Sequence, residues 1–241
     1  MIIAAICSAK NSGKSEIWGY HDFFADEVCR LATSQKRYAK LRQIFEKHPL
    51  DVMKIGPATG TFLHVAQQHG HYVLGCDVSS RFVEYAKTHY QVQIDQGRFE
   101  QMPYADEQFD VILLFNVIEN VPNQVEFLHA IHPTLKPGGY FILNFFDMQH
   151  NLIAALQKSR YFLYRPPVCY IYTMPVMRKV LEKFGFTSIK TFRDIRYLHL
   201  EKIATLLGWR GILSVARVLK LSRVHCPMYA YPSKILITQK Q

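Results

Sequence analysis

Short apolar runs alternate with amphipathic segments along most of this chain. The apolar runs predict strands at Asp51–Ile55, Tyr72–Asp77, Val92–Asp95, Phe109–Phe115 and Tyr140–Phe146. Helical spacing predicts helices at Asp26–Lys47, Thr61–Gln68 and Val125–Leu135, and one more that begins at Ser79 or Ser80. The run Phe109–Phe115 is apolar at nearly every position, which is typical of a strand covered on both faces. The alternation indicates an α/β fold with a doubly wound parallel sheet.

The pattern loosens after residue 147. There we expect helices at Asn151–Tyr164 and Met174–Phe184, one or two basic amphipathic helices within His199–Arg223, and strands at Thr187–Phe192 and Lys234–Thr238. The last strand would lie in the sheet beside Tyr140–Phe146, and Lys136–Gly139 would form a turn before that strand. The prediction is a single domain, with a leader and helix at 1–48, a core at 49–147 and a C-terminal part at 148–241.

The turn after the first strand consists of small residues, Gly56-Pro57-Ala58-Thr59-Gly60. Asp77 ends the next strand, 21 residues after Gly56. In open α/β sheets, ligands bind in the crevice at the carboxyl ends of the strands. Small residues let a ligand approach the backbone there, and an acidic residue about 20 positions on binds ribose hydroxyls. The spacing predicts a nucleoside-bearing ligand. The dinucleotide fingerprint G-x-G-x-x-G is excluded, because Ala58 and Thr61 stand at two of its glycine positions.

Composition places the chain among ordinary globular proteins, with 241 residues of which 49% are hydrophobic and 20% charged. No apolar run reaches the roughly 18 residues that span a bilayer. The apolar start, Met1–Cys7, lacks a preceding basic segment, so we expect a cytoplasmic protein without a signal peptide. The five cysteines are widely spaced and odd in number, which favours free thiols.

The excess of positive over negative charge lies entirely in the C-terminal part. Residues 151–241 hold 16 Lys and Arg against 3 Asp and Glu, whereas the chain as a whole has a net charge of +10. Such a field favours anionic partners: phosphorylated or nucleotide-linked substrates, RNA, or an acidic membrane surface. A solvated basic face without a partner is the alternative interpretation.

Two further patterns favour ordinary interpretations. Ser8–Ser15 resembles a phosphate-binding loop without its first glycine, but no strand of an α/β unit precedes it, so a flexible leader is favoured. His64, His69 and His71 lack the i, i+4 spacing of paired helical ligands and have no carboxylate with them. We therefore expect surface histidines and no metal site.

Several separated landmarks occur in a fixed order. They are Ile55–Leu63 (I-G-P-A-T-G-T-F-L), Gly75–Ser79 (G-C-D-V-S), Met102–Tyr104 with Asp106, Phe109–Ile112, Asn116–Val121 (N-V-I-E-N-V), Leu135–Gly139 (L-K-P-G-G) and Leu181–Phe186 (L-E-K-F-G-F). Over roughly residues 40–192 the chain resembles the class I S-adenosylmethionine-dependent methyltransferases that act on small molecules. The resemblance implies a Rossmann-like, seven-stranded sheet with helices on both faces, an N-terminal helical segment, a basic helical C-terminal insertion and S-adenosylmethionine as cofactor.

The resemblance also implies where the first half of the cofactor would lie. Gly56, Ala58 and Gly60 would line its methionine and ribose part. Asp77 would hold the ribose hydroxyls, and Val78 would pack on the adenine.

Two later segments would complete this cofactor site by the same resemblance. Arg98, Phe99 and Glu100 occupy the segment that usually contacts adenine. Asn116 and Val117 would lie under the sulfonium and its methyl group.

Three positions depart from the pattern of this family. Lys54 stands where an acidic residue usually helps to hold the cofactor's amino group; it would oppose the cofactor, or would pair with the cofactor carboxylate or with Asp77. If Lys54 opposes the cofactor, Lys54→Asp should tighten its binding. Arg98 replaces the usual adenine-contacting acid, and Cys169 stands where related sequences often have a histidine near the substrate.

The sequence indicates less clearly which residue covers the cofactor and which residue acts as a catalytic base. Tyr20 or Tyr38 would cover the cofactor from the N-terminal helix. Methyl transfer is a direct displacement in which alignment supplies much of the acceleration, and an oxygen acceptor also needs a base. The candidates near the crevice mouth are Asn116, Glu119, Asp147, His150 and Tyr172, and Glu119 also suits a structural role at a helix start.

The leading hypothesis is a methyltransferase for a small, anionic or amphipathic metabolite. Residues 147–172 and 199–223 would shape the acceptor pocket, and 199–223 would also suit contact with a membrane surface. One alternative is a degenerate, non-catalytic cofactor-binding protein or partner subunit, motivated by Lys54, Arg98 and Cys169. The other is an RNA methyltransferase, motivated by the basic C-terminal part and weakened because no Pro-Pro-aromatic sequence follows Asn116.

Overall fold

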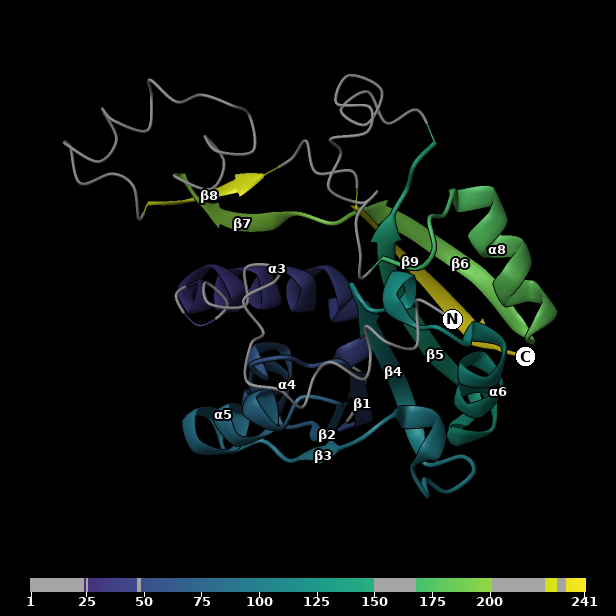
Figure 1. The fold of residues 1–241 in the computed structure, drawn as a ribbon, viewed down its shortest axis with the longest axis horizontal. Coiled ribbons are helices and arrows are strands. Elements are labelled where there is room, and N and C mark those ends of the chain that lie inside the picture. Colours follow the sequence, from purple (N-terminus) through teal and green to yellow (C-terminus); the bar gives the residue numbers. More distant parts are fainter. Residues whose placement is uncertain (1–23, 25, 47–48, 150–167, 201–223, 229–232) are drawn as a thin grey trace.

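The computed structural model describes residues 24, 26–46, 49–149, 168–200, 224–228 and 233–241 (Figure 1). In chain order its elements are α3 (Glu27–Phe45), β1 (Asp51–Ile55), α4 (Thr61–Gln68), β2 (Tyr72–Asp77), α5 (Ser80–Tyr90), β3 (Ile94–Gln96), η2 (Phe99–Gln101), β4 (Phe109–Phe115), η3 (Ile118–Asn120), α6 (Gln124–Thr134), β5 (Leu135–Phe146), α8 (Met174–Lys183), β6 (Phe186–Arg193), β7 (Arg196–His199), β8 (His225–Met228) and β9 (Ser233–Lys240). The described strands form a seven-stranded sheet and a separate two-stranded one.

The seven-stranded sheet has the order β3-β2-β1-β4-β5-β9-β6. Strands β3, β2, β1, β4 and β5 are parallel, and β9 is antiparallel to both β5 and β6. Along the chain the sheet grows from β1 toward β3 in one direction and from β4 toward β6 in the other. Ligands of such sheets bind where the direction of growth reverses, so the carboxyl ends of β1 and β4 mark the place for a site.

Helices cover both faces of this sheet, and the residues of β4 show how. Val111, Leu113 and Phe115 belong to a core that also contains residues of α3 and α4. Ile112 and Leu114 alternate with them and belong to a second core with α6 and α8. Figure 1 shows α3, α4 and α5 on one side of the sheet and α6 and α8 on the other. The doubly wound fold predicted from the apolar run is confirmed.

Most of the predicted elements are present within one or two residues of their expected ends. Four of them, β1, α4, β2 and β4, have the predicted bounds. The last strand lies beside β5 as expected, with Ile142 opposite Ile237.

Two local predictions were wrong. Lys136–Gly139 belongs to β5, which begins at Leu135 because the strand pairs there with Phe109 before the register shifts. His199 ends strand β7, which pairs with β8, instead of beginning a helix. Helix α5 begins at Ser80 as expected, with Ser79 at its N-cap position, although the Ser79 side chain makes no capping hydrogen bond.

Other predictions fall outside the described residues. They concern the segment Ser8–Ser15, which resembles a phosphate-binding loop, Tyr20, the helix at 151–164 with His150, and the basic segment 201–223. In the part of the chain that the structure describes, helices are too short or too polar to cross a membrane. Cys29, Cys76, Cys169 and Cys226 are free thiols.

Candidate functional site

The turn after β1 is tight because three of its residues adopt left-handed backbone conformations. The φ angles are +62° at Gly56, +53° at Ala58 and +84° at Gly60. A Cβ added to Gly56 would lie 2.5 Å from Cγ2 of Val117, so only glycine allows the chain after β4 to pack against this turn. The turn thus brings the carboxyl ends of β1 and β4 into direct contact at the predicted site.

Asp77 closes the same site from the neighbouring strand. Its Oδ2 accepts a hydrogen bond from the amide of Ala58 at 3.1 Å, and its Oδ1 accepts one from the amide of Ser79 at 3.0 Å. The carboxylate is 9% exposed and is therefore held in one orientation beside the turn. Val78 follows with 51% of its surface exposed, as a residue that packs on a flat ligand requires.

Asn116, directly after β4, combines strain with an unsatisfied polar atom. Its φ is +57°, which is uncommon for a residue other than glycine. Its amide donates to Oδ1 of Asn144 at 2.6 Å, whereas its own Oδ1 is buried without a hydrogen-bond partner among the described residues. Strained residues and orphaned buried acceptors concentrate at ligand sites.

A buried polar chain that the sequence did not indicate supports Asn116. Nδ2 of Asn144 donates to Oδ2 of Asp194 at 2.7 Å, and Arg37 donates to both oxygens of Asp194 at 2.9 and 2.6 Å. The Arg37 guanidinium holds the pKa of Asp194 below its usual value although burial alone would raise it. These hydrogen bonds connect α3 to β5 and to the loop between β6 and β7. One signal was present: Asn144 is the polar residue inside the apolar strand Tyr140–Phe146.

Lys54 points toward the α3 side of the sheet, beside this chain. Its Nζ lies 4.8 Å from the ring centroid of Phe115, and the Arg37 guanidinium carbon lies 4.5 Å from the same centroid. The residue is 5% exposed. Burial and the charge of Arg37 lower the pKa of Lys54 to about 7, against the opposite influence of Asp77. Lys54 is therefore partly neutral near pH 7, so it opposes another cation less than its sequence suggests.

The segment predicted to contact adenine lies next to Asp77. Gln96 of β3 is the register partner of Asp77, and η2 begins three residues later at Phe99. The ring of Phe99 is buried against Tyr104. Arg98 pairs with Glu100 at 3.0 Å, so the charge that replaces the usual acid is balanced locally.

The candidate bases engage in bonds that hold the fold. Asp147 accepts hydrogen bonds from Lys234 and from the amide of Met174, the first residue of α8. The Tyr172 hydroxyl donates to Gln124, and burial raises its pKa to about 12. Glu119 accepts from the amide of Phe146 at 2.9 Å, and burial raises its pKa. His150 lies outside the described residues.

Cys169 lies against this Glu119 segment. Its amide donates to the carbonyl oxygen of Glu119 at 2.7 Å, and its thiol is partly exposed. The contact brings the segment before α8 to the chain that follows β4, close to Asn116 in sequence. Cys169 thus contacts the segment that follows β4.

Tyr38 and the histidines lie elsewhere. Tyr38 is buried and bonds Nε2 of His71 at 2.9 Å, while the amide of Leu50 donates to Nδ1 of His71 at 3.2 Å. These residues lie at the amino ends of the strands, so Tyr38 does not cover the site, and His71, 6% exposed, is not a surface histidine. Within the described ranges, no three His, Cys, Asp or Glu side chains gather as metal ligands.

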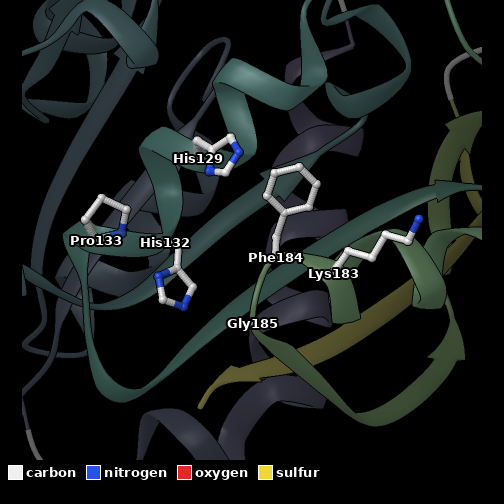
Figure 2. A pocket seen from close by; sticks show the side chains of 6 residues that line it. All are labelled: His129, His132, Pro133, Lys183, Phe184 and Gly185. Atoms are coloured by element: carbon white, nitrogen blue, oxygen red, sulfur yellow. The ribbon is translucent and has the colours of Figure 1, made fainter.

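A pocket of about 420 Å³ lies at the same amino edge, between α6 and the start of β6. Figure 2 shows its walls, which are formed by His129, His132, Pro133, Lys183, Phe184 and Gly185. None of these residues belongs to the turn after β1 or to the chain after β4. The pocket is therefore separate from the candidate site.

Comparisons with known proteins agree with this geometry. Residues 53–143 match the family described as methyltransferase domain. A demethylmenaquinone methyltransferase of Alkalihalophilus pseudofirmus is 31% identical over 143 residues, which cover 56% of this chain and 57% of that protein. A tRNA U34 carboxymethyltransferase of Desulfotalea psychrophila is 25% identical over 173 residues, covering 67% of this chain and 53% of that protein. The chain spans about half the length of the curated relatives it matches.

A solved structure shares the fold. The magnesium protoporphyrin IX methyltransferase of Synechocystis, crystallised with S-adenosylhomocysteine, has a TM-score of 0.61 and 16% identity; the match covers 89% of this chain and 84% of that one. The fold is thus that of Rossmann-like methyltransferases. Over residues 53–143 the chain is thus similar to methyltransferases, as the sequence landmarks predicted. The family match supports the prediction that the cofactor is S-adenosylmethionine.

The residues present fit that cofactor. The turn at Gly56–Gly60 leaves no side chain larger than methyl on Gly56, Ala58 and Gly60. Asp77 offers a fixed carboxylate, and Asn116 offers a buried acceptor without a partner among the described residues. All three features lie where β1, β2 and β4 end.

Proposed function

We propose that this chain methylates a small-molecule acceptor, with the cofactor held at the carboxyl ends of β1, β2 and β4. The convergence of the Gly56–Gly60 turn, Asp77 and Asn116 at the reversal point of the sheet carries this proposal. The family match and the small-molecule methyltransferases among the relatives support it.

Each residue has a proposed task at the cofactor. Asp77 accepts the ribose hydroxyls, Val78 packs on the adenine and the segment Arg98, Phe99 and Glu100 borders it. Val117 lies under the reacting centre beside Gly56. The bound cofactor supplies an electrophilic methyl group, and the protein supplies alignment of the acceptor with it.

We further propose that the acceptor is anionic or amphipathic. β7 packs on α3, where the amide of Tyr197 donates to Oγ1 of Thr33 at 3.0 Å. This brings Arg196 near Arg30, whose pKa falls to about 10 through burial and the charge of Arg196. Arg196 also lowers the pKa of Glu119 against the larger, opposite effect of burial, so it faces the segment that follows β4. A cation there favours an anionic group on the acceptor.

The test begins with binding and ends with turnover. Purified protein is titrated with S-adenosylhomocysteine in a calorimeter, and a panel of small acids and quinone-like phenols is then screened for methylation. We expect stoichiometric binding that Asp77→Ala weakens at least about 100-fold, because a buried carboxylate that bonds two hydroxyls is lost. Binding that is absent at millimolar ligand, or unchanged in Asp77→Ala, contradicts the proposal.

RNA is the second candidate acceptor. The basic residues 151–241 and the similarity to a tRNA U34 carboxymethyltransferase favour it. RNA binding in the micromolar range that weakens steeply with salt supports this candidate. A third candidate, a cofactor-binding partner subunit without catalysis, rests on the structural bonds of Asp147 and Tyr172. Binding of S-adenosylhomocysteine without turnover of small molecules or RNA supports the third.

A further inference from the structure

Lys54 is a buried cation with few partners. Its Nζ donates a hydrogen bond of 3.5 Å to the carbonyl oxygen of Gly56 and lies 4.8 Å from the ring centroid of Phe115. Among the described residues, no carboxylate lies within ion-pair distance of its Nζ. A buried charge without a counter-ion is costly, so a site that retains one favours an anionic ligand.

The charged groups that face Lys54 come from two elements. Arg37 of α3 lowers the pKa of Lys54, and Asp77 of β2 raises it. Arg37 is itself paired with Asp194, and the Asp77 oxygens accept from the amides of Ala58 and Ser79. Neither the Asp77 nor the Asp194 carboxylate therefore forms an ion pair with Lys54. The anion that pairs with Lys54 must come from outside the described protein groups.

Gly56 links Lys54 to the segment that contains Asn116. Lys54 Nζ approaches the carbonyl oxygen of Gly56, while Val117, the neighbour of Asn116 in sequence, occupies the space where a Cβ of residue 56 would lie. Lys54 is a donor, and Oδ1 of Asn116 is an acceptor without a partner among the described residues. A donor cation and an unpartnered acceptor in the segments that meet at this glycine match a ligand that carries both a carboxylate and an ammonium group.

We propose that Lys54 binds the carboxylate of the cofactor's amino-acid end, while Asn116 accepts from its ammonium group. The inference rests on the proposed function, since it concerns the same site. This contact explains why a lysine can stand where related sequences have an acidic residue. The acidic residue would contact the cofactor's amino group, whereas Lys54 contacts the cofactor's carboxylate. The same contact also predicts that Lys54→Asp weakens cofactor binding, because a carboxylate would then face a carboxylate.

Proton uptake follows from this pairing. The pKa of Lys54 is about 7 in the protein alone, so much of the side chain is neutral at pH 8. A bound carboxylate stabilises the charged form and raises that pKa, so binding at pH 8 draws a proton onto Lys54. Affinity for the carboxylate should consequently fall as pH rises from 7 to 9.

The experiment compares two ligands that differ only in the carboxylate, S-adenosylhomocysteine and its decarboxylated analogue. The wild type should bind the first about 10- to 100-fold more tightly, the range of one charge-assisted hydrogen bond. Lys54→Met should reduce this ratio to below about threefold. Lys136→Met is the matched control, because it removes a lysine at the opposite edge of the sheet, and it should leave the ratio unchanged.

The second readout is calorimetry of S-adenosylhomocysteine at pH 8 in buffers of different ionisation enthalpy. The wild type should take up about 0.5–1 proton on binding, and Lys54→Met close to none. An undiminished ligand ratio in Lys54→Met, or no proton uptake by the wild type, overturns the inference while leaving the proposed function standing. Failure of the wild type to bind S-adenosylhomocysteine overturns both. Wild-type data from the ligand pair and the buffers decide the matter even if Lys54→Met does not fold.

Discussion

The two ends of the parallel strands, called here the amino edge and the carboxyl edge, differ in how their polar groups are paired. At the amino edge, Nζ of Lys136 lies 2.8 Å from Asp51 and 2.9 Å from Asp110, and His71 bonds both Leu50 and Tyr38. At the carboxyl edge, Asn116 is strained and has an orphaned oxygen, and Lys54 is a buried cation.

This difference indicates where the molecule holds groups for a ligand instead of for itself. Polar groups that serve stability are paired within the protein, because a buried unpaired group costs free energy. Groups that serve a ligand remain unpaired until it binds, and they lower stability meanwhile. Substitutions should therefore destabilise the protein at one edge and stabilise it at the other.

The largest expected effect is a gain of stability in Lys54→Met. Burial lowers the pKa of Lys54 from 10.5 to about 7, so charging it in the folded protein costs on the order of 5 kcal/mol below pH 7. Between pH 7 and 10.5 only the unfolded chain holds the proton, so wild-type stability rises with pH there. Lys54→Met should be more stable at pH 6, by an amount that shrinks toward pH 10.

Urea unfolding at pH 6, 8 and 10 measures this effect. Lys136→Met again serves as the control: its ion pairs are partly exposed, so it should lose at most about 1 kcal/mol. Parallel pH profiles for wild type and Lys54→Met would show that Lys54 is not a buried, strained charge.

His71→Ala should have the next largest effect, in the opposite direction. It leaves the Leu50 amide and the Tyr38 hydroxyl without their partner in a buried place, which should lower the free energy of unfolding by about 2–3 kcal/mol. Tyr38→Phe removes only one of the two bonds and should cost about 1 kcal/mol. Affinity for S-adenosylhomocysteine should stay within about twofold in both variants. A tenfold loss of affinity would place the ligand at the wrong edge.

Asn116→Gly should have the smallest effect on stability. This variant also separates the effect on stability from the effect on affinity for S-adenosylhomocysteine. Glycine adopts a φ of +57° without strain, so the variant should be stabilised by about 1 kcal/mol. It also loses the Oδ1 acceptor, so affinity for S-adenosylhomocysteine should fall about 5- to 10-fold. Thermal unfolding and calorimetry on the same samples measure both quantities. A variant that is stabilised and binds normally would remove Asn116 from the site.

The sequence predicted the edge at which we propose that the ligand binds, because local signals suffice there. The apolar runs and glycines bound β1, α4, β2 and β4, and the position of Asp77 follows from the end of β2. The reversal of strand order then places Gly56 and Asn116 together without any distant contact being known.

The residues that support the site could not be predicted from the sequence, because they are joined by contacts between positions far apart in the chain. Arg37 and Asp194 are 157 residues apart, and no periodicity links an arginine in a helix to an aspartate in a loop. β7 and β8 pair across 25 residues, with His199 opposite His225, and their short polar sequences lack a strand signal. The sequence also suggested a fully charged Lys54. The pKa of Lys54 depends on its burial, which the sequence does not give.

The sharpest test is a crystal structure of the protein grown with S-adenosylhomocysteine. We expect the ribose hydroxyls on Asp77 and the amino-acid end between Asn116 and Lys54, with its carboxylate within about 3 Å of Nζ of Lys54. A ligand in the pocket beside His132, or one whose carboxylate points away from Lys54, would contradict this expectation.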